Sequence, residues 1–123
     1  ASRISPIIKS ESINQITTIA SKMFVDPSIM EYISEIVSLT RTHKDVALGV
    51  SMRGALALAR AVKTWAIASG RNYVTPDDVR DLAVAVLAHR VIVDPESDFA
   101  GVKAEDIISG ILVDIAPPAF RAA

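Results

Sequence analysis

The stretch that most constrains the fold of this chain is residues 48–65, which read LGVSMRGALALARAVKTW. Apolar residues recur there at the three- and four-residue spacing of a helix, and alanines on the other sides let neighbouring helices approach closely. Ser51 is a suitable N-cap, whose hydroxyl would accept from the first-turn amides, and Gly70 suits the position just after a helix. The sequence therefore predicts a central helix of about five turns. We expect Trp65 to be a buried anchor of its core face.

Capping signals and apolar periodicity predict four more helices. Ser12 with Gln15 begins the first, and Asp26 followed by Pro27 begins the second, which should stop near Thr40 or Arg41. Thr75-Pro76-Asp77-Asp78 begins the fourth, and Pro117-Pro118 ends the fifth. The apolar stripes are Ile13, Ile16, Ile19, Ala20, Met23 and Phe24; then Ile29, Tyr32, Ile33, Ile36, Val37 and Leu39; then Val79, Leu82, Ala83, Val86 and Leu87; and finally Ile107, Ile108, Ile111, Leu112 and Ile115.

The connections between these helices carry little regular pattern. Residues 41–50 have no helical stripe, and the pieces near 71–74 and 91–93 are short and extended. Because these pieces are too short to indicate a sheet, we expect none. The acidic run after Val93 is expected to be a solvated loop. The predicted fold class is all-α: a small helical bundle of about five helices, with short extended segments near 71–74 and 91–93.

Composition excludes several classes of function. The chain of 123 residues has 13 basic and 14 acidic side chains, so its formal net charge of -1 argues against nucleic acid or an anionic membrane surface as the main partner. Cysteine is absent, which removes disulfides and thiolate metal sites. No apolar run reaches the ~18 residues that a membrane span needs. We expect a cytoplasmic protein without membrane insertion.

Several motifs resemble sites and fail on a required residue. Gly49 to Gly54 has the outline of a phosphate loop, but Ala55-Leu56 stands where lysine and a hydroxyl residue are needed. Asp94, Glu96, Asp98 and Glu105 fit a calcium-loop spacing, yet Phe99 replaces the essential glycine. We therefore predict no metal site.

The remaining ionisable candidates favour structural roles. His43 lies near Asp45 in the sequence without any nucleophile motif, and His89 comes at the end of the fourth helix, where the dipole suits it. The acidic residues Asp77, Asp78 and Asp81 lie at or near a helix first turn, where carboxylates are expected. No catalytic residue is predicted in the chain.

Arg53 is different, because it falls in the first turn of the central helix. The dipole and the unpaired amides there favour an anion, so a cation is unfavourable unless something negative binds it. Arg60 lies on the same helix face and Lys63 on its shoulder, where a solvated basic stripe is an adequate explanation. For Arg53, flanked by Gly54, a phosphate is the partner that the guanidinium fork would suit best.

Three blocks of the sequence carry a family resemblance: residues 48–58, residues 70–79 and residues 87–91. In this order and spacing they resemble the C-terminal lid domain of MoxR-family AAA+ ATPases. The resemblance covers roughly residues 10–117. It implies a lead-in from an ATPase core over 1–9, a helical lid over 10–116 and a tail over 117–123. It assigns Arg53 as the sensor 2 arginine, which contacts the ATP γ-phosphate.

The resemblance also implies partners and a mechanism. The full-length parent would bind ATP and magnesium in a separate AAA+ core domain of the same chain, whereas the isolated domain needs no cofactor and has no ATPase activity. Neighbouring subunits of a hexameric ring, client proteins and proteins with a von Willebrand factor A domain are the implied partners, in a chaperone role. Two departures stand out: Met52 replaces a usual proline, and Lys103 replaces a threonine that would cap the fifth helix.

Two other functional classes share part of this pattern. A long central helix followed by Tyr73-Val74-Thr75-Pro76 also occurs in histone-fold modules, which would make the chain a dimerisation or assembly protein. A helix-turn-helix at the junction of the third and fourth helices is the other alternative, although it lacks a basic recognition helix.

Overall fold

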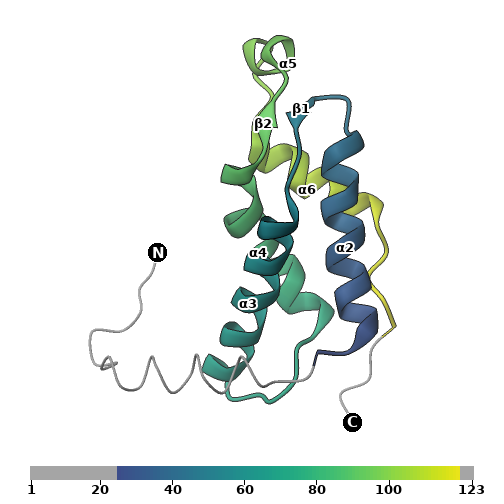
Figure 1. The fold of residues 1–123 in the computed structure, drawn as a ribbon, viewed down its shortest axis with the longest axis vertical. Coiled ribbons are helices and arrows are strands. Elements are labelled where there is room, and N and C mark those ends of the chain that lie inside the picture. The colour runs from purple at the N-terminus through teal and green to yellow at the C-terminus, as the bar shows by residue number, and fades with distance from the viewer. Residues whose placement is uncertain (1–24, 120–123) are drawn as a thin grey trace, which may run out of the picture.

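The computed structural model describes residues 25–119 of the chain, and these form a bundle of helices with a small sheet at one end (Figure 1). The three longest helices are α2 (Pro27–Thr42), α3 (Met52–Ala68) and α4 (Pro76–Leu87). A 3-10 turn, η1 (Ala88–Arg90), extends α4, and α6 (Ala104–Asp114) packs against both α2 and α4. The expected all-α bundle is confirmed, while the expected helix over residues 12–24 lies outside the described residues.

Within the described residues, the predicted apolar stripes supply most of the core. On α6, all of Ile107, Ile108, Ile111 and Leu112 are buried, and Ile115 just beyond its end is buried too. On α2 the stripe is buried except for Leu39, which lies at the exposed side. The centre of the core is aliphatic and includes Ile33, Leu58, Val62, Val79 and Leu87. Helix spacing in the sequence was therefore sufficient to find the core faces of α2, α4 and α6.

Two helix starts follow the predicted capping chemistry. The carboxylate of Asp26 accepts from the Ser28 amide at 2.9 Å, with Pro27 in the first helical position. Thr75 and Asp78 form a reciprocal capping box, since each side chain accepts from the backbone amide of the other. Both starts are thus encoded by residues within four positions of one another.

The central helix ends as predicted and begins differently. Gly70 has a φ of 82°, and the amides of Gly70 and Arg71 donate to the carbonyls of Ile67 and Ala66. This is the Schellman arrangement, in which glycine relieves the strain of a left-handed residue. The Ser51 side chain, in contrast, makes no capping hydrogen bond. The prediction that its hydroxyl accepts from the first turn is wrong; the chain just before α3 is held instead by hydrogen bonds between α2 and Val50.

A two-stranded sheet corrects the expectation that no sheet forms. Strand β1 (Val46–Leu48) pairs antiparallel with β2 (Ile92–Val93), with Val46 opposite Val93 and Leu48 opposite Ile92. β2 falls within the predicted extended piece 91–93, whereas residues 71–74 contain a bend at 72–73 and no strand. The sheet was missed because its two short strands lie far apart in sequence, and such pairing leaves no local pattern.

The acidic run after β2 was expected to be a solvated loop, and this expectation is wrong for its first residues. A short helix, α5 (Pro95–Phe99), occupies the start of the predicted loop, and the Asp94 carboxylate caps it by accepting from the Ser97 amide at 3.3 Å. Ser97 Oγ donates to Asp45 at 2.8 Å, which joins this element to the loop before β1. α6 begins after Lys103 without a side-chain cap, as the replacement of threonine by lysine at this position predicts.

Trp65 is not a core anchor. Its side chain is 46% exposed, while Leu58, Val62 and Ala66 form the buried ridge of α3. The buried face of α3 is formed by residues spaced three or four positions apart, and Trp65 lies at the edge of this face, so part of its side chain contacts solvent. The prediction of a buried indole is therefore wrong.

The exposure of Trp65 changes what its removal should cost. We expect Trp65→Ala to lower the free energy of unfolding by less than about 1 kcal/mol, since surface substitutions have small effects. The matched core variant Leu58→Ala should cost about 2–5 kcal/mol. Urea unfolding of the two variants measures both values, and a loss at position 65 as large as that at position 58 would contradict the exposed placement.

Candidate functional site

The start of α3 is held by the last turns of α2. The Thr40 hydroxyl is buried, donates to the Val37 carbonyl at 2.6 Å and accepts from the Val50 amide at 2.9 Å. Arg41 Nε donates to the carbonyl of the same Val50 at 2.9 Å. Val50, itself fully buried, thus has both backbone polar groups tied to α2. The residue three positions before Arg53 is therefore fixed in place.

Two glycines allow this close approach. A Cβ at Gly49 would come within 2.8 Å of the Arg41 backbone, and a Cβ at Gly54 would overlap with Val50 Cγ1. The same Cβ at Gly54 would lie 3.2 Å from Cδ of Arg90. The chain between α2 and α3 is therefore packed tightly, and the side chain of Arg90 passes beside the first turn of α3.

Arg53 is exposed, and within residues 25–119 its side chain makes no hydrogen bond and no ion pair. The ion pair of Arg71 with Asp78 and the 4.0 Å contact of His43 with Asp45, which are the charged contacts of the described residues, lie outside α3. The amides of Met52 and Arg53 also have no acceptor within this part of the chain, since Ser51 does not cap them. An unpaired guanidinium on a rigid helix start is thus available to an anion.

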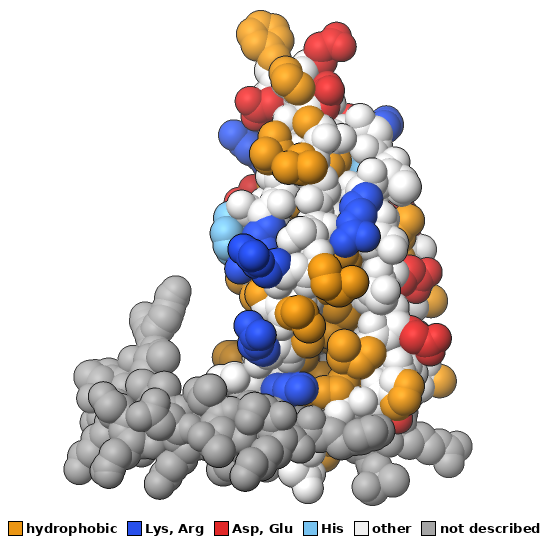
Figure 2. Space-filling model, viewed as in Figure 1, with side chains coloured by type: hydrophobic (Ala, Val, Ile, Leu, Met, Phe, Trp, Pro, Cys, Tyr) orange, Lys and Arg blue, Asp and Glu red, His pale blue; other side chains and the backbone are white. Residues whose placement is uncertain are grey.

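Two further arginine side chains lie near the start of α3. Arg41 uses only Nε for Val50, and the Arg90 stem lies beside Gly54. Sequence reasoning had not assigned either residue, because their proximity to α3 depends on contacts across the bundle. The available signal was the pair Gly49 and Gly54, whose missing side chains leave room for arginine stems. Figure 2 shows basic side chains gathered along one edge of this face of the molecule.

The other sequence candidates are structural. Nδ1 of His43 accepts from the Asp45 amide at 3.0 Å, which orders the turn before β1. His89 lies exposed in η1. Among residues 25–119, no three histidine or acidic side chains gather closely enough to hold a metal ion. No helix in this part of the chain is long and apolar enough to cross a membrane.

Asp78 is the one buried charge in the described part of the chain. The Arg71 guanidinium donates to both of its oxygens, at 2.8 and 2.7 Å, and the Thr75 amide donates at 2.8 Å. Burial raises the pKa of the Asp78 carboxyl, but the hydrogen bonds from Arg71 and Thr75 outweigh burial and hold that pKa below its usual range. Asp78 thus fastens the α3–α4 connection to the start of α4.

The order of these elements, with a free arginine on a fixed central helix, agrees with one protein family. Residues 38–111 match the AAA lid domain family. The chain is an AAA lid domain. The matched range runs from the end of α2 through most of α6, so it includes the Arg53 region and both strands.

Relatives place this lid domain with the MoxR AAA+ proteins. The chain is 40% identical over 120 residues to "Uncharacterized protein YeaC" of Bacillus subtilis, with 98% of the chain and 38% of that protein covered. It is 27% identical over 125 residues to "Chaperone MoxR1" of Mycobacterium tuberculosis, with 94% of the chain and 33% of that protein covered. The chain thus spans about a third of the length of these relatives. The lid domain is of the MoxR type, as the sequence resemblance predicted.

A solved structure agrees with the fold. A crystal structure from Cytophaga hutchinsonii, described as that of a candidate ATPase, superposes with a TM-score of 0.82 at 28% identity. The match covers 89% of the lid domain and 36% of that chain. With the family established, a histone-fold assembly module and a helix-turn-helix no longer account for the sequence.

Proposed function

We propose that this lid domain couples ATP binding and hydrolysis in a MoxR-type ATPase to movement of the lid, and that Arg53 is its sensor 2 residue. The observation that supports this role is the unpaired Arg53 guanidinium at the fixed start of α3. ATP, bound together with magnesium by an AAA+ core in the full-length parent, would supply through its phosphates the anionic partner for Arg53. The isolated lid domain contributes no phosphate loop and is proposed to have no turnover of its own.

The mechanism rests on rigidity. Arg53 would donate its N–H groups to the γ-phosphate, where such contacts are strongest because charge accumulates during phosphoryl transfer. Since Thr40 and Arg41 fix Val50, a shift of Arg53 would be transmitted to α2 and from there to the bundle as a whole. Loss of the γ-phosphate would remove the contact and let the lid rotate as one body.

The parent is proposed to act as a chaperone. The support is its relatedness to "Chaperone MoxR1", and AAA+ membership supports assembly with neighbouring subunits, for which we propose a hexameric ring. Client proteins and proteins with a von Willebrand factor A domain are the proposed partners. Arg53 would then contact nucleotide at the junction between lid and core.

The experiment is steady-state ATP turnover of the full-length parent. We expect Arg53→Ala to lower turnover at least tenfold, which corresponds to about 1.4 kcal/mol of transition-state stabilisation. Arg60→Ala is the matched control, since Arg60 is also an exposed arginine on α3, without a partner in the described part of the chain. Arg60→Ala should leave the rate of ATP turnover within twofold of the rate of the unsubstituted full-length protein. Equal rates for the parent and Arg53→Ala would remove the sensor role.

A further inference from the structure

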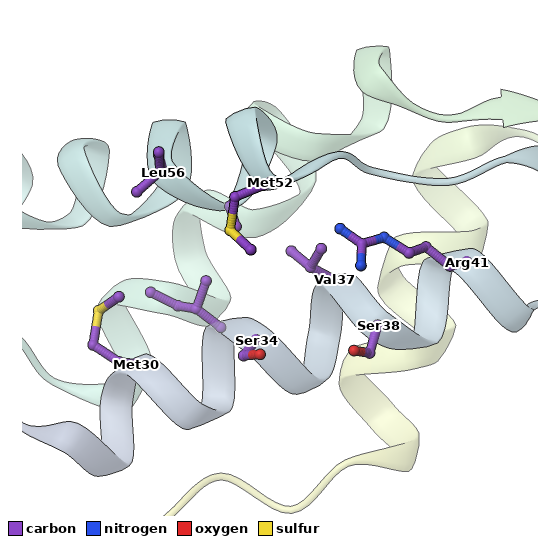
Figure 3. A pocket seen from close by; sticks show the side chains of 9 residues that line it. Met30, Ser34, Val37, Ser38, Arg41, Met52 and Leu56 are labelled. Carbon is purple, nitrogen blue, oxygen red and sulfur yellow. The ribbon is translucent and has the colours of Figure 1, made fainter.

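An apolar groove runs between α2 and α3 on the face shown in Figures 2 and 3. Met30, Ile33 and Val37 line it from α2, and Met52, Ala55 and Leu56 line it from α3. We call it the α2–α3 groove. In Figure 2 hydrophobic side chains fill the middle of the lower part of this face, where basic side chains lie along one edge and at the upper end, and acidic side chains lie along the other edge.

The α2–α3 groove exposes more apolar surface than an isolated surface residue would. Met30 is 39% exposed, Met52 65% and Leu56 45%. Its volume is about 210 Å³. Because an apolar cavity of about 150 Å³ already accepts one benzene ring, the groove has room for at least one large side chain. Contiguous apolar surface of this kind marks a contact site.

The occupant is indicated by the chain that leads into α2. Residues 12–24 lie outside the described residues, and their sequence places apolar side chains at helical spacing, among them Ile13, Ile16 and Ile19, ending in Met23 and Phe24. This segment ends directly before Val25 and the helix cap Asp26. It is therefore tethered at the Met30 end of the groove, at a high effective concentration.

The dimensions also agree. The groove follows α2 from Met30 to Arg41, which is about 17 Å along a helix, and a helix over residues 12–24 is about 20 Å long. Antiparallel helices joined by a few residues are a common arrangement, and Val25-Asp26 supplies such a link. The reversal would bring Ile16 beside Val37, which lies next to Met52 (Figure 3).

We propose that residues 12–24 pack as a helix into the α2–α3 groove, antiparallel to α2, and complete the lid bundle on this face. The apolar side of the segment covers Met52, Leu56 and Met30. This packing makes the segment that precedes α2 part of the rigid lid and does not depend on a nucleotide role for Arg53. The pivot between lid and core would then lie before Ser12.

Cysteine cross-linking of the 123-residue chain tests the packing, because the chain has no native cysteine. We expect the double variant Ile16→Cys with Met52→Cys to form an intramolecular disulfide under mild oxidation. The control is Ile16→Cys with Ala85→Cys, where Ala85 is exposed on α4. The first pair should cross-link at least fivefold more than the control, and circular dichroism verifies that both variants are folded.

The pattern of products decides the proposal. A monomeric, cross-linked band that depends on Met52→Cys supports it. A cross-link that appears only as a dimer would overturn it, since a second copy would then fill the groove. Equal yields for the two pairs, or no cross-link in either, would overturn it as well.

Discussion

Asp78→Ala is expected to lower the free energy of unfolding by about 3 kcal/mol, because it leaves Arg71 without its bidentate partner and removes one half of the Thr75 capping box. The side chain of Asp78 is 4% exposed and that of Arg71 is 25% exposed, so Arg71 regains only part of its hydration. This places the loss near the lower end of the range for buried ion pairs. Thermal and urea unfolding of the 123-residue chain measure it.

Asp77→Ala is the matched control for this prediction. Asp77 lies in the same first turn of α4, is exposed and has no ion pair in the described part of the chain. Asp77→Ala should lower the free energy of unfolding by less than about 0.5 kcal/mol. Similar losses at positions 77 and 78 would show that the Arg71 ion pair adds nothing beyond general helix-dipole effects.

The depressed pKa of Asp78 also predicts a pH dependence. A carboxyl whose pKa is lower in the folded chain than in the unfolded chain stabilises the fold above the unfolded value of about 3.9. That stabilisation is lost as the pH falls through the folded pKa. The difference in unfolding free energy between the unsubstituted 123-residue chain and its Asp78→Asn variant should therefore shrink on acidification below pH ~4. A constant difference would contradict the lowered pKa.

Thr40→Val is the second substitution with a large expected effect. It keeps the shape of the side chain and removes the buried hydroxyl that accepts from the Val50 amide, so this amide is left without its acceptor in the core. An unsatisfied buried donor costs about 1–3 kcal/mol, and we expect a loss near 2 kcal/mol. Because Val50 precedes α3, amide exchange at Val50 should also accelerate more than exchange in the centre of α4.

Thr42→Val controls for the change from threonine to valine near the same helix end. Thr42 is the last residue of α2 and is exposed. Thr42→Val should therefore change the free energy of unfolding by no more than about 0.5 kcal/mol. If Thr40→Val were equally mild, the hydroxyl of Thr40 would not be what fixes the chain before α3.

Local chemistry explains what the sequence could predict. The starts of α2 and α4 depend on Asp26 and on Thr75 with Asp78, whose partners lie within three residues, so these signals can be read without knowing the fold. Gly70 is similar, because a left-handed residue after a helix favours glycine whatever surrounds it. The apolar spacing of α6 was fully predictive for the same reason.

Contacts between distant segments explain what was missed. The pairing of Val46 with Val93 and the packing of Arg90 beside Gly54 arise only when the bundle is assembled. Trp65 was misplaced because residue type favoured burial, whereas the direction of the α3 ridge decides exposure. For the site, the sequence singled out Arg53 but not Thr40 and Arg41, whose hydrogen bonds to Val50 hold it in position.

The most direct test of the role of Arg53 is a structure of the full-length parent with magnesium and a non-hydrolysable ATP analogue. The measured quantity is the distance from the Arg53 guanidinium to the nearest γ-phosphate oxygen. We expect a hydrogen-bond distance of about 3 Å. An Arg53 side chain paired instead with a carboxylate of its own bundle, or held beyond water-mediated reach of the γ-phosphate, would contradict the proposed coupling.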